Sequence, residues 1–159
     1  MPSDDFAKLE QRAKNILLHR LSRSMRTRHE LSIALKKREI PDEVAILVLD
    51  RFEEAQLIDD KVFAEAFVRA RLQMGKSASM IRRELKQKGV SDSLVMQSTA
   101  EISADQEQQL ASELASQRYR RMTGLDRAVA ERRLMGYLQR RGFAQQLAHR
   151  AVREAMGPR

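Results

Sequence analysis

Hydrophobic residues recur along most of the chain at the three- and four-residue spacing of an amphipathic helix. Near the N-terminus this spacing is set by Phe6, Leu9, Ala13, Ile16 and Leu17. Residues three and four apart lie on one face of a helix, so each such stretch has one side to bury. We find no segment with the strict alternation that is typical of a β-strand. The pattern therefore predicts an all-α protein.

Capping residues and glycines predict where these helices begin and end. Thr27 is followed three residues later by Glu30, and Ser103 by Gln106, which is the spacing of a capping box. Other expected N-terminal caps are Asp59 or Asp60, Ser77, Ser91 and Asp126, and expected C-terminal glycines are Gly75, Gly89 and Gly142. Together these signals predict helices over residues 6–22, 27–38, 41–55, 60–74, 77–88, 91–102, 103–122, 126–141 and 144–156.

One ten-residue pattern occurs three times. It reads LKKREIPDEV from Leu35, LKQKGVSDSL from Leu85 and LQRRGFAQQL from Leu138. The copies are offset by 50 and 53 residues (85 − 35 and 138 − 85). A repeat of this period is typical of units that stack on their neighbours to bury a hydrophobic face. We therefore predict an elongated tandem array of three three-helix units, over residues 1–56, 57–102 and 103–159.

The composition restricts the class of protein further. Hydrophobic residues make up 42% of the 159 residues, as in folded domains. Because the chain has no cysteine, disulfides, thiol nucleophiles and cysteine-based zinc sites are excluded. No run approaches the ~18 apolar residues of a membrane span, and the acidic start MPSDDFAKLE lacks the apolar core of a signal peptide. We expect a cytoplasmic protein that does not bind a membrane.

Positive charge is concentrated in particular segments. The formal net charge is +8 and the pI is about 10.3, which favours a polyanionic partner such as nucleic acid or an acidic protein surface. Residues 12–38 contain nine Lys or Arg and one acidic residue, whereas residues 39–66 contain nine acidic residues and two basic ones. On the helix predicted over 77–88, basic side chains fall opposite Ile81 and Leu85. Each unit is therefore expected to present one basic face.

The sequence contains no recognisable catalytic or metal site. His19, His29 and His149 are far apart and lack metal-ligand spacing. The carboxylates at 59–60 are interpreted as helix caps rather than as a catalytic pair. The tripeptide that begins at Gly75 lacks the upstream glycine and the preceding strand of a phosphate-binding loop. We therefore predict no enzymatic activity, no cofactor and no metal.

The segment from residue 56 to residue 95 resembles the middle of the RecX family, regulators of the RecA recombinase. The matching positions are Leu57, Asp59, Asp60, Phe63, Ala64, Phe67, Arg71, Gly75, Ile81, Glu84, Leu85, Lys88 and Gly89, with Thr27, Glu30 and Leu31 in the first unit. The third unit matches mainly in period and hydrophobicity. The chain departs from the family pattern at Gln56, Ser77 and Glu39, where glycine is usual, and these departures concern turn and cap geometry.

The resemblance implies a role in modulating RecA, and thereby in homologous recombination, DNA repair and the SOS response. Family members are thought to lie in the helical groove of the RecA–DNA filament and to limit its growth, ATP hydrolysis and strand exchange. The expected partners are the RecA filament and, without sequence specificity, single- or double-stranded DNA, bound by a monomer. Two alternatives stay open: a protein that binds DNA directly, either sequence-tolerant or of the helix-turn-helix type, and a helical scaffold whose charge serves only solubility.

Candidate contact residues follow from the resemblance and from the charge pattern. Arg71 and Lys88 lie on the family pattern, and the others follow from charge placement. The first group is Arg69, Arg71, Lys76, Arg82, Arg83, Lys86 and Lys88. The second group is Lys36, Lys37, Arg132, Arg133, Arg140 and Arg141.

Overall fold

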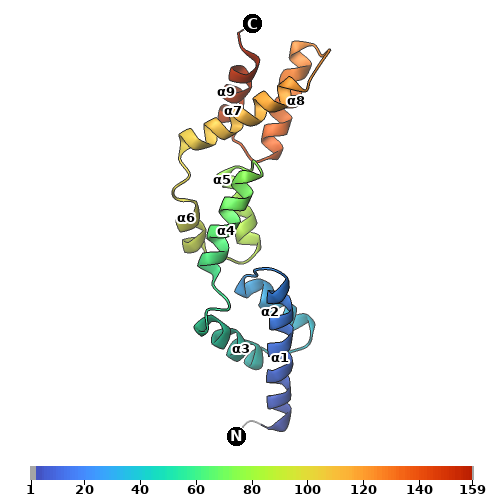
Figure 1. Cartoon of the computed structure of the whole chain (residues 1–159), viewed down its shortest axis with the longest axis vertical. Coiled ribbons are helices and arrows are strands. Elements are labelled where there is room, and N and C mark those ends of the chain that lie inside the picture. The colour runs from blue at the N-terminus through green and yellow to red at the C-terminus, as the bar shows by residue number, and fades with distance from the viewer. Residues whose placement is uncertain (1–2, 159) are drawn as a thin grey trace. The chain divides into compact units, whose positions relative to one another are not determined.

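The computed structural model of the chain describes residues 3–158, and its regular elements are helices (Figure 1). They are α1 (Asp4–Arg23), α2 (Arg28–Lys37), α3 (Asp42–Glu54), α4 (Asp60–Gln73), α5 (Ala78–Gln87), α6 (Asp92–Thr99), α7 (Ala104–Arg120), α8 (Arg127–Arg140) and α9 (Gln145–Met156). No strand occurs among the described residues. The predicted all-α fold class is therefore confirmed.

One compact unit comprises residues 3–66 and 85–95. Its core is a cluster of mainly aliphatic side chains, most of them from α1, α2 and α3, in which Leu17, Leu35 and Val48 are completely buried. Burying one such side chain contributes roughly 1.5–3 kcal/mol to the free energy of unfolding. The three- and four-residue hydrophobic spacing of the sequence thus becomes the contact surface between these three helices.

A second compact unit comprises residues 67–84 and 96–158. Here α7 and α9 pack closely, and the residues at their contact are small: Ala111 and Ala115 on α7 and Ala148 on α9 are completely buried. Leu134 and Leu138 of α8, also completely buried, fill the remaining space. Alanines therefore allow the two helices to approach closely, while larger side chains such as these leucines fill the rest of the core.

The boundary between the two compact units passes through α4 and α5. The helices predicted to form the middle repeat therefore contribute residues to both units: Ala64 of α4 belongs to the first and Phe67 to the second. The limits of the three repeats stay a prediction.

Side-chain caps begin several helices at the expected residues. Thr27 Oγ1 accepts a hydrogen bond from the Glu30 amide, and Glu30 Oε1 accepts one from the Thr27 amide, both at 3.1 Å. The capping box predicted for α2 is therefore present. Side-chain oxygens of Asp59, Ser77 and Ser91 accept from the first amides of α4, α5 and α6 in the same way.

Two expected caps are weaker than predicted. Ser103 Oγ accepts from the Gln106 amide at 3.0 Å, but the return bond that would complete a capping box is absent between these residues. Asp126 lies at the N-cap of α8, yet its side chain makes no capping hydrogen bond. In both places the residue type marks the helix start correctly, although the side chain satisfies fewer amides than the pattern suggests.

The N-terminus of α2 is bonded to residues of the predicted second repeat. Thr27 Oγ1 donates to the Lys88 carbonyl oxygen at 2.6 Å, and the Arg28 amide donates to Asp60 Oδ1 at 2.9 Å. The first amides of a helix have no partner within the helix, and the positive end of its dipole favours a carboxylate. This joint therefore satisfies groups that α2 alone would leave exposed.

An equivalent joint occurs at the N-terminus of α5. The Ser77 amide donates to the Arg141 carbonyl oxygen at 3.0 Å, and the Ala78 amide donates to Glu107 Oε1 at 2.6 Å. Ser77 and Arg141 hold the same positions in their repeats as the threonine and lysine of the α2 joint. The repeated sequence thus produces a repeated contact between helix ends.

Glycine is required where these joints are tight. Gly89 and Gly142 follow α5 and α8 with φ of +81° and +93°. A Cβ on Gly89 would lie 2.5 Å from His29 Cδ2, and one on Gly142 would lie 2.7 Å from Met80 Cβ, which is too close in either case. Glu39, the corresponding residue after α2, has the same left-handed backbone with a φ of 61°.

Candidate functional site

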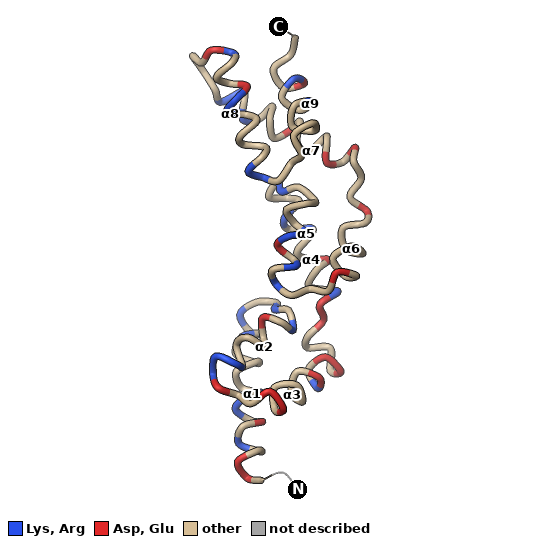
Figure 2. Tube along the Cα trace, turned by 180° about the vertical axis from the view of Figure 1, so that it is seen from behind, with Lys and Arg blue, Asp and Glu red and all other residues tan. Residues whose placement is uncertain are grey.

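Lysine and arginine residues recur along α2, α5 and α8, while acidic residues gather on α3 (Figure 2). A cation already paired with a carboxylate of the protein attracts an external anion less than an exposed cation without such a partner. By this criterion the predicted contact residues fall into two classes. Some have acidic partners within the protein, and others face solvent.

Glu84 on α5 holds two of the predicted contact residues. Arg71 Nε lies 2.9 Å from Glu84 Oε2, and Lys76 Nζ lies 2.5 Å from Glu84 Oε1. Burial opposes ionisation of Glu84, but the hydrogen bonds and charges of Lys76 and Arg71 outweigh it, so the pKa of Glu84 lies below its ordinary value. Arg71 also stacks on the Phe67 ring, 4.4 Å from its centroid. These two cations therefore stabilise the turn between α4 and α5.

Lys88 and Lys86 also lie near acidic residues. Lys88 Nζ is 3.4 Å from Glu30 Oε2, beside the Thr27 capping box. Lys86 Nζ is 4.0 Å from Asp92 Oδ1, and the two side chains are 57% and 88% exposed. An ion pair this exposed contributes little to stability. Lys86 is therefore available to an external partner, whereas Lys88 is held at the joint with α2.

The remaining predicted residues of α2, α4 and α5 are more accessible. Arg69, Arg83, Lys36 and Lys37 are exposed, and Arg82 is half-buried. None of them forms an ion pair with any residue between 3 and 158. Lys36 and Lys37 lie in the last turn of α2, where the negative end of the helix dipole favours cations.

Arginines gather around one hollow between α7 and α8. The hollow encloses about 780 Å³ and is lined by Arg118, Arg121, Met122, Val129, Arg132, Arg133, Gly136 and Arg140. We call it the arginine hollow. No acidic residue is among its described lining residues, and none of its five arginines forms an ion pair with another described residue. Three of the five, Arg132, Arg133 and Arg140, are predicted contact residues that the fold brings together.

The residue spacing of α8 places these side chains on one face. Arg133, Gly136 and Arg140 follow one another at intervals of three and four residues, whereas Leu134 and Leu138 are buried in the core. A Cβ on Gly136 would lie 3.1 Å from Arg140 Nη1. Glycine at this point therefore leaves room for the Arg140 guanidinium to lie along the helix.

Arg141, which was predicted with this group, does not line the arginine hollow. Its guanidinium carbon lies 4.9 Å from the centroid of the Tyr137 ring, and that of Arg118 lies 4.6 Å from the same centroid. Arg141 Nη1 also donates to the Met74 carbonyl oxygen. Arg141 therefore stabilises the packing of α8 against the turn after α4, while Tyr137 helps to hold Arg118 at the hollow.

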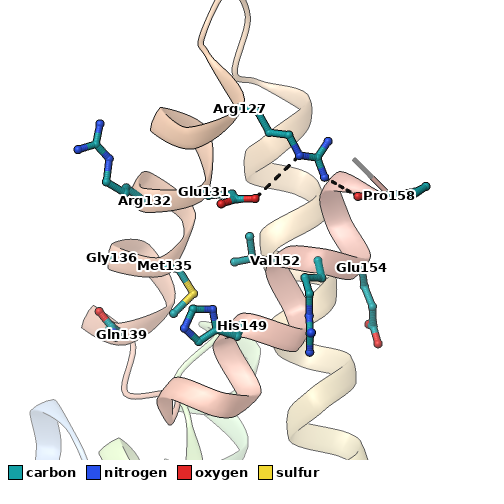
Figure 3. Close-up of a pocket in the computed structure, with 12 residues that line it drawn as sticks. Arg127, Glu131, Arg132, Met135, Gly136, Gln139, His149, Val152, Glu154 and Pro158 are labelled. Carbon is teal, nitrogen blue, oxygen red and sulfur yellow. Dashed lines mark hydrogen bonds and ion pairs between the residues drawn. The ribbon is translucent and has the colours of Figure 1, made fainter.

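A second hollow of about 950 Å³ lies between α8 and α9 and shares Arg132 and Gly136 with the arginine hollow (Figure 3). Met135 and Val152 give it an apolar surface. Its cations are partly balanced within the protein, because Arg127 Nε lies 3.9 Å from Glu131 Oε1 and Arg127 Nη2 donates to the Gly157 carbonyl oxygen at 2.5 Å. The second hollow thus contains acidic partners for its cations, which the described lining of the arginine hollow lacks.

The described structure places the carboxylates at 59–60 at helix N-termini and shows no group of metal ligands. Between residues 3 and 158, no three His, Asp or Glu side chains are grouped so that they could hold a metal ion. Asp59 Oδ1 accepts from the amides of Lys61 and Val62 at the start of α4, and Asp60 accepts from the Arg28 amide. Both carboxylates thus bind backbone amides. No described helix is long and apolar enough to cross a membrane.

Sequence reasoning had not singled out Arg118 and Arg121 as contact residues. Both lie at the C-terminal end of α7, and they line the arginine hollow because α7 and α8 pack together. The signal available in the sequence was the excess of basic residues between 118 and 141. That signal gives the charge of the segment but not which side chains converge.

Family models of RecX match the chain in three consecutive segments. The model of the first three-helix domain of RecX matches residues 13–52, the second three-helix domain matches residues 59–98, and the third matches residues 105–152. The matches follow one another in the order of the family and together cover more than half of the chain.

Known sequences give the same result. Regulatory protein RecX of Thermobifida fusca is 43% identical over 156 residues, which cover 98% of this chain and 82% of the relative. Regulatory protein RecX of Streptomyces coelicolor is 41% identical over 147 residues, which cover 92% of this chain and 78% of the relative. The similarity therefore extends through all three segments.

Two crystal structures of other proteins resemble the structure of this chain. RecX from Lactobacillus salivarius has a TM-score of 0.80 and 21% identity, covering 94% of this chain and 98% of that chain, and at this identity the likeness concerns the fold alone. A crystal structure of regulatory protein RecX has a TM-score of 0.78 and 26% identity, covering 94% of this chain and 74% of that chain.

Proposed function

Because the chain belongs to the RecX family of regulatory proteins, we propose that it restrains the RecA recombinase by binding the RecA–DNA filament. The expected site on the partner is the helical groove of the filament. Binding there limits filament growth, ATP hydrolysis and strand exchange. The observation that carries this proposal is the ordered match of all three RecX domains along one chain.

The charge distribution supports the proposal. Exposed cations without acidic partners among the described residues occur on α2 (Lys36 and Lys37), on α5 (Arg83) and on α8 (Arg133). A filament of RecA on DNA repeats its binding surfaces along its axis, so several weak contacts can be made by one molecule. Linked contacts raise the overall affinity because the second contact becomes intramolecular. Cations on successive repeats suit a polymeric, negatively charged partner.

Regulation by binding also requires no chemistry of the chain itself. We expect the bound protein to obstruct the addition of RecA subunits and the motions that accompany ATP turnover, in the cytoplasm and as a monomer. Sedimentation of the purified protein would test the monomer, which is expected at micromolar concentration.

The direct test measures DNA-dependent ATP hydrolysis and strand exchange by RecA with and without this protein. The expected result is a dose-dependent fall in both rates at amounts at or below one molecule per RecA subunit. Unchanged rates at stoichiometric amounts, under conditions in which the protein remains folded by circular dichroism, would refute the proposal.

A second candidate function is direct DNA binding without RecA. The observation that favours it is the arginine hollow, which concentrates five cations in one place. A helix-turn-helix reader would show a strong sequence preference on bare duplex at physiological salt. Equal affinity for unrelated sequences would instead indicate sequence-tolerant DNA binding.

A further inference from the structure

We propose that the arginine hollow is a binding site for the phosphodiester backbone of a nucleic acid. This inference rests on the proposed function for its setting, since a RecA filament carries DNA, but its chemistry can be tested without RecA. It assigns the DNA contact to the α7–α8 surface rather than to the basic face of α5.

The first argument is the missing counter-charge. Glu84 neutralises Arg71 and Lys76, and Glu131 lies beside Arg127. The described residues that line the arginine hollow carry five guanidinium groups and no carboxylate, and one of them, Arg132, also lines the neighbouring hollow with Glu131 and Glu154. Like charges held around one cavity repel one another, and an external anion relieves that repulsion. The five arginines that line the hollow therefore favour an anionic ligand there.

The second argument is the type of cation. All five charged residues of the hollow are arginine, and none is lysine. A guanidinium presents several N–H donors in a planar fork, which matches the oxygens of a phosphate and allows two parallel hydrogen bonds. A phosphodiester strand carries one charge per nucleotide on a thin backbone. A hollow of about 780 Å³ has room for more than one phosphate group of such a strand. A folded acidic protein, in contrast, presents separate carboxylates on a broad surface, which fits a narrow hollow less well.

The third argument is the construction of the site. Tyr137 lies under the guanidinium of Arg118 and limits its orientations. Gly136 lets the Arg140 guanidinium lie along α8 at the hollow, with Arg140 Nη1 3.1 Å from where a Cβ would stand. Met122 and Val129 supply apolar surface that a sugar or base can cover. The hollow thus combines oriented donors with room for a ligand.

The test compares two double variants with the same net charge. Arg121→Gln with Arg133→Gln removes two cations of the arginine hollow, one after α7 and one on α8. Arg120→Gln with Arg150→Gln removes two exposed cations that do not line it. Gln has good helix propensity, and circular dichroism and thermal unfolding would verify that both variants fold.

Binding is measured by fluorescence anisotropy with a labelled 20-nucleotide single strand, the duplex of the same sequence and a labelled polyglutamate peptide, over a range of salt concentrations. We expect the hollow variant to bind nucleic acid roughly tenfold more weakly than the native protein at 0.1 M salt. Its salt slope on single strands should fall by about 1.4, because each lost phosphate contact contributes about 0.7. The control variant should stay within about twofold. Comparing the loss of affinity for the single strand with that for the duplex shows which form of nucleic acid the hollow binds.

Three results would overturn the proposal: equal losses in both variants, no binding of the native protein to either nucleic acid at low salt, or a loss confined to polyglutamate. The last would assign the hollow to an acidic protein surface. This binding assay contains no RecA. A negative result would therefore refute the nucleic-acid site without bearing on the proposed inhibition of RecA ATP hydrolysis. Conversely, a failure to inhibit RecA would not affect a positive binding result.

Discussion

Glu39 and Gly89 hold the same position in successive repeats and share a left-handed backbone, with φ of 61° and +81°, but their surroundings differ. His29 occupies the space next to Gly89, whereas Glu39 is exposed. Glycine serves two purposes at this position: it tolerates the positive φ, and it lets another helix start come close. Glu39 adopts the positive φ at an energetic cost, because it has a Cβ, and its exposed position does not require the close approach of another helix.

Replacing Glu39 with glycine should therefore stabilise the protein. A non-glycine residue in the left-handed region lowers the free energy of unfolding by roughly 1–2 kcal/mol. Replacing it with glycine recovers only part of this, because glycine also has more conformational freedom in the unfolded chain. We expect Glu39→Gly to raise the free energy of unfolding in urea by roughly 0.5–1 kcal/mol. Glu39→Ala is the control, because it removes the carboxylate and keeps the strained φ. An equal gain in both variants would attribute the effect to charge and contradict the account.

Replacing Gly89 with alanine should have the opposite effect. The new Cβ meets His29 as well as the positive φ, so we expect a loss of about 2–4 kcal/mol, the sum of backbone strain and overpacking. Gly124 offers a matched control: its φ is +71°, and a Cβ there has no neighbour within 4 Å. Gly124→Ala should lose only the strain part, about 1 kcal/mol. Similar losses in chemical denaturation of the two variants would show that the joint with His29 is unimportant.

The ion pairs of Glu84 predict a dependence of stability on pH. The pKa of Glu84 is lower in the folded protein than in the unfolded chain, because Lys76 and Arg71 outweigh the effect of burial. Its stabilising contribution is therefore complete above the unfolded pKa of about 4.3 and is lost as the pH falls through the lower folded value. The free energy of unfolding of Glu84→Gln should be below that of the native protein at pH 7, and the gap should narrow below pH 4. Glu65→Gln on α4 controls for net charge, and a gap that widens toward low pH would contradict the assignment.

The predicted contact residues on α4 and α5 should divide into two kinds. Arg71→Gln should lower the melting temperature, since it removes a partner of Glu84. Arg83→Glu with Lys86→Glu should leave the melting temperature nearly unchanged and weaken binding to RecA–DNA filaments in a co-sedimentation assay. A matched reversal at Lys8 and Lys61, both exposed, serves as the control. Equal weakening by the control pair would mean that overall charge, rather than the α5 face, governs binding.

The features that could be predicted from the sequence are those that depend on residues close together in the chain. Thr27 and Glu30 are three residues apart, so their capping box is visible as a local pattern, and Leu35, Leu85 and Leu138 give the repeat because each faces a core. The partners of the cations could not be predicted in this way. Lys88 and Glu30 are 58 residues apart, and the arginine hollow exists only because α7 packs beside α8. The charge pattern therefore located basic segments, and tertiary packing decided which cations are accessible.

The measurement that tests the central claim most directly is the growth of single RecA filaments on long single-stranded DNA, followed in real time by fluorescence. The account predicts that this protein, added at a fraction of the RecA concentration, slows or stops extension and leaves nucleation less affected. Extension at an unchanged rate in the presence of one molecule per RecA subunit would contradict it.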